Sequence, residues 1–178
     1  MTRVGRMVAS AVFVAVGIIL PITFHFVGAM GSVFLPMHIP ILMAGLFLGP
    51  LAGLTVGMMT PILSSLLTGM PPLLPALPLM TIELSVYGAV GGYLYRMRHL
   101  PLVVALIAAM IAGRVAALVG VYGFANLLQL KLTPIAYAAG LAAGLPGIAV
   151  QLIAVPRLVK RLESSFHKNN NLIQESVG

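Results

Sequence analysis

Charged residues are scarce in this chain of 178 residues: they make up 7% of the sequence, whereas hydrophobic residues make up 60%. A soluble domain carries about 25% charged residues, so this chain has too little charge to cover a surface in water. Cysteine is absent, which excludes disulfides, thiol catalysis and cysteine-ligated metal centres. Aspartate is absent too, and intramembrane aspartyl proteases need two. We therefore expect an all-α integral membrane protein.

The few charges divide the chain into long apolar stretches. A membrane-spanning helix needs about 20 residues, so the length allows six spans and leaves no room for a soluble ATPase or receptor domain. Glycine and proline clusters mark the breaks between helices. We predict six transmembrane helices, over residues 7–24, 37–48, 51–67, 75–95, 101–125 and 134–155.

The six helices form one predicted membrane domain, residues 1–162. The second helix, 37–48, is short for a full crossing, so we expect it to tilt or to be shielded by its neighbours. Residues 163–178 are polar and include three consecutive asparagines. This composition predicts a disordered cytoplasmic tail.

Positive charge predicts the orientation. Lys and Arg number ten against three Asp and Glu, and cationic residues flank membrane helices on the cytoplasmic side. Six crossings place both termini on one side. With the N-terminus in the cytoplasm, eight of the ten cations lie inside, Lys131 lies outside and Arg114 lies within a span. We therefore predict that both termini are cytoplasmic.

Glu83 and Arg114 are the two charges within the predicted spans. A charge in hydrocarbon is costly and usually faces a partner or a wet cavity. Two interpretations stay open: a structural salt bridge between helices, or the polar floor of an outward-facing ligand pocket. Tyr87 lies one turn from Glu83 on the same face. Tyr122 and Asn126 follow Arg114 towards the outer end of its helix, although a tyrosine there is also typical of a membrane-interface anchor.

His38 follows Met37 where an outer loop enters the second helix. It suits either a packing role or a neutral donor or acceptor at the rim of a pocket. Neither a third ligand nor a carboxylate accompanies His38 and His25, so we expect no metal and no cofactor. Gln151 in the sixth helix looks too deep for such a pocket unless that helix begins later than residue 134.

Motifs for catalysis are missing. The chain has no Walker motif, so it does not hydrolyse ATP by itself, and the Ser64-Ser65 pair has no histidine on a plausible partner helix. We expect that the protein is not an enzyme. Glu83 keeps open an autonomous proton-coupled carrier, and a membrane scaffold without a small-molecule ligand is a third possibility.

Ala11 and Ala15 are four residues apart in the first helix. Such a pair forms a smooth stripe where another helix can approach closely. Packing within the protein and docking of a partner membrane protein both fit this stripe.

Over residues 7–160 the chain resembles the substrate-binding S component of an energy-coupling factor (ECF) vitamin transporter. The resemblance lies in the six-span layout, the alanine stripe and several local motifs. These motifs are Phe34-Leu35-Pro36-Met37-His38-Ile39-Pro40, Gly69-Met70-Pro71-Pro72, Glu83 with Tyr87-Gly88, Gly113-Arg114, and Leu145-Pro146-Gly147-Ile148 followed by Gln151.

The resemblance implies a multi-pass protein in the plasma membrane of a prokaryote. It would bind a vitamin or precursor from outside with high affinity and topple to deliver it, on a transmembrane coupling subunit powered by two cytoplasmic ATPases. Ala11 and Ala15 would contact the coupling subunit. The residues implied in substrate binding are Met37, His38, Glu83, Tyr87, Arg114, Tyr122 and Asn126.

The sequence leaves two classes of ligand open, one with a carboxylate and one without charge. The absence of tryptophan disfavours flat aromatic vitamins, which such proteins often bind by stacking. Arg114 suits a carboxylate, as in a pantothenate-like ligand. If Glu83 already neutralises Arg114, an uncharged ligand of the α-ribazole type fits better.

Overall fold

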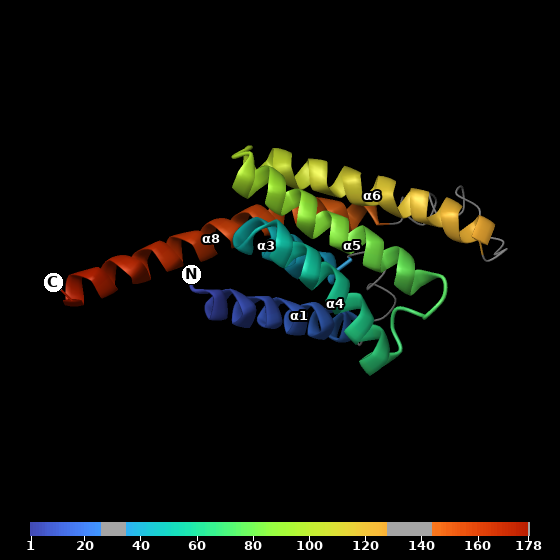
Figure 1. Ribbon diagram of the computed structural model, residues 1–178, viewed down its shortest axis with the longest axis horizontal. Helices are drawn as coiled ribbons and strands as arrows, with labels where there is room; N and C mark the ends of the chain where they lie inside the picture. The colour runs from blue at the N-terminus through green and yellow to red at the C-terminus, as the bar shows by residue number, and fades with distance from the viewer. Residues whose placement is uncertain (26–34, 128–143, 178) are drawn as a thin grey trace.

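The structure, a computed structural model, describes residues 1–25, 35–127 and 144–177 (Figure 1), with side chains at 1–23, 35–124 and 144–165. Every regular element in these ranges is helical, which confirms the predicted all-α class. Three helices, α1, α4 and α6, are long and apolar enough to cross a membrane. In chain order the elements are α1 (Arg3–His25), α3 (His38–Leu48), α4 (Pro50–Thr68), α5 (Ala76–Gly92), the π-helix η1 (Tyr93–Met97), α6 (Leu102–Leu127) and α8 (Leu145–Val177).

Local sequence explains most helix ends. Gly49 alone separates α3 from α4, and its φ of 108° lies in the region that favours glycine. Pro50 then begins α4, where a missing N–H has no cost. The predicted helix 75–95 corresponds to α5 and part of η1.

The last predicted helix, residues 134–155, is described in its C-terminal part only. α8 is described from Leu145, and the predicted start at residue 134 lies outside the described residues. The helix then continues to Val177, through residues 163–177, for which the sequence predicted disorder. The division at residue 163 therefore does not coincide with a helix end.

The short helix α3 lies at the centre of the described helices. It packs against α1, α4, α5 and α8, and all its residues except Ile39 are buried. A helix that is apolar all round is a buried helix. The prediction that neighbours shield this helix is therefore confirmed.

Glycines allow α3, α4 and α5 to approach backbone to backbone. A Cβ atom added to Gly45 or to Gly53 would collide with the carbonyl group of Gly88, and one added to Gly57 would collide with that of Leu84. Small residues at such spacings permit close helix contact in membranes. These three helices thus form a tightly packed block.

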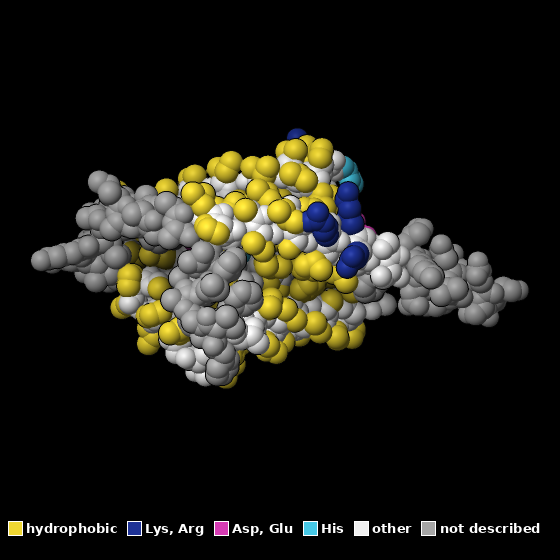
Figure 2. Space-filling view, turned by 180° about the vertical axis from the view of Figure 1, so that it is seen from behind, with side chains coloured by type: hydrophobic (Ala, Val, Ile, Leu, Met, Phe, Trp, Pro, Cys, Tyr) yellow, Lys and Arg dark blue, Asp and Glu magenta, His cyan; other side chains and the backbone are white. Residues whose placement is uncertain are grey.

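Arginine and lysine side chains gather at one end of the molecule (Figure 2). We call this the basic end; it includes Arg96 and Arg98, where α5 passes through η1 to α6. The helices α5 and α6 run antiparallel, so α5 begins and α6 ends at the opposite end (Figure 1).

Candidate ligand-binding site

Glu83 on α5 and Arg114 on α6 form an ion pair between neighbouring helices. Arg114 Nη1 lies 2.9 Å from Glu83 Oε1. Glu83 is 3% exposed, and the Arg114 side chain is 16% exposed. Because both charges are largely removed from solvent, each offsets part of the desolvation cost of the other. The structure therefore brings together the two intramembrane charges that the sequence singled out.

His38, at the first turn of α3, is next to this pair. Its Nε2 atom lies 3.6 Å from Glu83 Oε1. Its ring also meets the ring of Tyr87 edge to face, with 5.3 Å between ring centroids. His38 is 2% exposed and Tyr87 is fully buried. Four of the predicted site residues, on three helices, are therefore in one cluster.

Gly113 explains why Tyr87 fits beside Arg114. A Cβ atom on Gly113 would collide with the Tyr87 ring atoms Cδ1 and Cε1 and would lie 2.9 Å from the Glu83 carbonyl oxygen. Only glycine lets α6 approach α5 this closely at the site. In the Gly113-Arg114 motif, the glycine thus allows close contact between α6 and α5, and the arginine supplies the charge that pairs with Glu83.

Gln151 on α8 is a fifth polar residue at this depth, and sequence reasoning left it out as too deep. It is 1% exposed. Its helix is described from Leu145, so Gln151 lies in the second turn rather than far along the span. The available signal was a lone amide in an otherwise apolar stretch.

The site residues form a layer on top of the apolar core. His38, Glu83, Arg114 and Gln151 are each four residues from a core member, so each lies one helical turn from it. In every case the polar residue is on the side away from the basic end. The core members, which belong to one buried cluster, are Leu42, Tyr87, Met110 and Val155. We call the four polar residues the polar layer.

The polar layer offers hydrogen-bonding atoms that the described part of the chain does not use. There, both ring nitrogens of His38, Nε and Nη2 of Arg114, and both amide atoms of Gln151 are buried without a hydrogen-bond partner. Native proteins leave few buried polar groups unsatisfied, because each one costs free energy. Such a layer can bind a small polar molecule.

Three further predicted site residues do not belong to the polar layer as defined here. Met37 is buried in a different apolar cluster. Tyr122 is 66% exposed, as expected for the membrane-interface alternative. Asn126 belongs to the last turn of α6, and its side chain lies outside the described residues.

The alanine stripe of α1 is exposed. Ala11 and Ala15 both lie on the surface, beside Val8 and Val12, which are also exposed. The opposite side of α1 packs on α3 and α4, where a Cβ on Gly17 would come within 2.6 Å of Thr60. The stripe is therefore free for lipid or for another protein.

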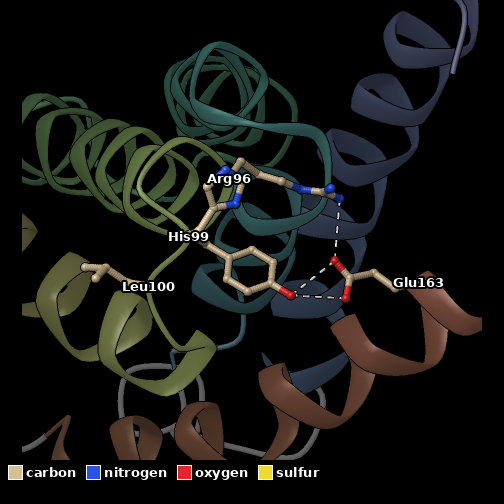
Figure 3. A pocket seen from close by; sticks show the side chains of 5 residues that line it. Arg96, His99, Leu100 and Glu163 are labelled. Atoms are coloured by element: carbon tan, nitrogen blue, oxygen red, sulfur yellow. Dashed lines mark hydrogen bonds and ion pairs between the residues drawn. The ribbon is translucent and has the colours of Figure 1, made fainter.

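A second polar cluster lies at the basic end, around a cavity of about 260 Å³ lined by Tyr95, Arg96, His99, Leu100 and Glu163 (Figure 3). Arg96 Nε donates to the Leu46 carbonyl at 2.9 Å, and Nη2 donates to that of Phe47. Glu163 lies 3.6 Å from Arg96 and accepts a hydrogen bond from the Tyr95 hydroxyl. This cluster joins η1 to the end of α3 and to α8.

Metal ligands do not gather in the described ranges. No group of three His, Cys, Asp or Glu side chains in residues 1–23, 35–124 and 144–165 is placed to hold an ion.

Comparison with known proteins gives one match. A family model described as "ECF transporter, substrate-specific component" matches residues 5–159. No curated protein and no solved structure matches the chain.

Proposed function

The chain belongs to the family of ECF transporter substrate-specific components, and from this premise we propose that it is the high-affinity substrate-binding subunit of an ECF-type importer for a small vitamin or vitamin precursor. Such components are transporter subunits that bind substrate in the membrane. One observation carries the proposal: the buried polar layer with unused hydrogen-bonding atoms.

The binding site in this proposal is the polar layer with Tyr87. Four helices supply it, and its residues lie on the side of the core away from the basic end. Met37 and Asn126 stay predictions as substrate-binding residues. We leave Tyr122 out of the proposed site because it is exposed.

Energy for transport comes, in this proposal, from partner chains. The sequence holds no nucleotide-binding motif, so a transmembrane coupling subunit and two cytoplasmic ATPases would supply it. The exposed stripe of Ala11 and Ala15 suits the coupling subunit, because small side chains let a partner helix approach closely. Toppling on that subunit would deliver the ligand.

We further propose six crossings in a prokaryotic plasma membrane, with both termini in the cytoplasm. The grouping of Lys and Arg at one end of the molecule (Figure 2) supports this orientation. The polar layer then faces the outer side of the membrane.

Co-purification tests the docking proposal. The chain expressed with its coupling subunit and ATPases should form a stable complex, and Ala11→Trp with Ala15→Trp should abolish it by blocking close helix contact. Val119→Trp, at a position 67% exposed on α6, is the matched control and should leave the complex intact. Normal assembly of the double tryptophan variant would contradict docking at this stripe.

Mass spectrometry of small molecules released from the purified protein tests the binding proposal. We expect one vitamin-like compound in near-stoichiometric amount. Release of no compound, even after incubation with cell extract, would contradict a binding function and favour the scaffold alternative.

The alternative of an autonomous proton-coupled carrier uses Glu83 as the proton site. The close contact with Arg114 gives Glu83 a structural partner, and no observation favours this alternative. It predicts pH-driven ligand uptake into liposomes that contain this chain alone, and we expect none.

A further inference from the structure

The guanidinium group of Arg114 has one edge in use and one edge unused. Nη1 is paired with Glu83 at 2.9 Å. Nε and Nη2 are buried and have no hydrogen-bond partner among the described residues. These two nitrogens carry parallel N–H groups in a fixed geometry, which matches a pair of acceptor positions on a planar group.

Gln151 and His38 add further hydrogen-bonding groups to the same layer. The Gln151 carboxamide has donors on one atom and an acceptor on the other, and within the described part of the chain both atoms are without a partner. The His38 ring adds two nitrogens, both buried and without a hydrogen-bond partner among the described residues. The polar layer therefore offers both hydrogen-bond donors and hydrogen-bond acceptors to a ligand.

The charge balance of the layer limits what enters it. Glu83 and Arg114 carry opposite charges and lie in contact, so together they are neutral. A carboxylate or phosphate bound to the free edge of Arg114 would place two anions beside one buried guanidinium, with His38 as the one other titratable side chain of the polar layer. An uncompensated charge in a buried membrane site is strongly unfavourable.

We infer that the ligand presents to the polar layer an uncharged planar group with donor and acceptor atoms side by side, such as a carboxamide or a lactam. Nε and Nη2 of Arg114 donate to its acceptor oxygen, and the Gln151 carboxamide oxygen accepts from its neighbouring N–H group. This inference rests on the proposed function and adds the chemical class of the substrate.

The chemical identity of the released molecule is the first test. We expect a compound that is uncharged at pH 7 and carries a planar amide-like group. A released compound that is an ionised acid would overturn the inference and leave the proposed function standing. Release of no compound would overturn both.

Retention of that released molecule by variants is the second test. Gln151→Leu should lower its affinity about tenfold or more, the scale of lost hydrogen bonds in a buried site. The melting temperature of the ligand-free variant should stay equal or rise, because a buried unsatisfied amide is removed. Ser85→Ala is the matched control, since the Ser85 hydroxyl is buried and already donates to the Thr81 carbonyl at 2.6 Å.

A charge-free variant tests the role of Arg114. Glu83→Gln combined with Arg114→Gln keeps the layer polar and neutral while it removes the guanidinium edge, so affinity should again fall about tenfold or more. Wild-type retention by both this variant and Gln151→Leu would overturn the inference.

Discussion

Glu83 is buried on α5, within reach of a cation on α6 and an imidazole on α3. The sequence alone showed that Glu83 and Arg114 lie within apolar spans, and so that each needed a partner. It did not show that His38 joins them, because the contact depends on how α3 packs against α5. At the residue scale, this ion pair is the feature most open to measurement.

We predict that Arg114→Leu destabilises the protein by about 3–5 kcal/mol, because Glu83 loses its cation while it stays buried. The double variant Glu83→Gln, Arg114→Leu should be more stable than Arg114→Leu, since no charge then remains in the pair. Thermal unfolding in detergent measures both.

Additive losses in this pair of variants would contradict the prediction. Residues that act as one ion pair show a coupling energy, whereas independent residues add. Glu83→Gln alone completes the cycle and also leaves the buried Arg114 charge without its carboxylate.

Gln151 shows why a residue of the proposed site was left out of the sequence prediction. Its assigned depth followed from a helix expected to begin at residue 134, whereas α8 is described from Leu145. Helix ends are set by capping and tertiary contacts, which hydropathy does not report. The type of residue was visible in the sequence, but its place in the bundle was not.

At the scale of elements, neighbouring helices make their closest contacts at glycines, which have no side chain to keep the backbones apart. On α6, Gly113 faces the Tyr87 ring, whereas an added Cβ on Gly123 would have no atom of the described residues within 4 Å. The two glycines therefore form a matched pair on a single helix.

We predict that Gly113→Ala destabilises the protein by about 1–3 kcal/mol, the usual cost of overpacking a filled site. It should also weaken ligand binding, because α6 would move away from α5. Gly123→Ala should be neutral or stabilising, since alanine favours a helix over glycine. Equal melting temperatures for both variants would show that α5 and α6 are not in close contact at Gly113.

The structure gives the Ser64-Ser65 pair, which the sequence analysis considered for catalysis, a structural role. Ser64 and Ser65 donate hydrogen bonds to the carbonyls of Met70 and Pro71 at 2.7 and 2.8 Å, so they secure the turn between α4 and α5. Helix positions were largely predictable, since apolar length and proline breaks mark them. Partners of a hydroxyl across a turn were not, because they depend on the path of the chain.

At the scale of the whole molecule, the orientation in the membrane follows from the basic end. The chain has no cysteine, so one introduced cysteine is a unique label. Leu73 in the α4–α5 turn is 66% exposed, and Met97 at the basic end is 60% exposed.

We predict that a membrane-impermeant maleimide labels Leu73→Cys on intact cells, because the proposed orientation places this turn outside. Met97→Cys should react only after permeabilisation, since positive charge keeps the basic end in the cytoplasm. Labelling of Met97→Cys on intact cells, with protection of Leu73→Cys, would indicate the inverted orientation.

The exposed face of α1 has a consequence for the strength of any complex formed there. Lipid tails are as apolar as valine, so a partner that replaces lipid on Val8 and Val12 gains little hydrophobic free energy. The attraction then comes from close contact over Ala11 and Ala15, a short surface. In the proposed complex, the strength of association therefore depends on these two alanines rather than on the amount of apolar surface that the partner covers.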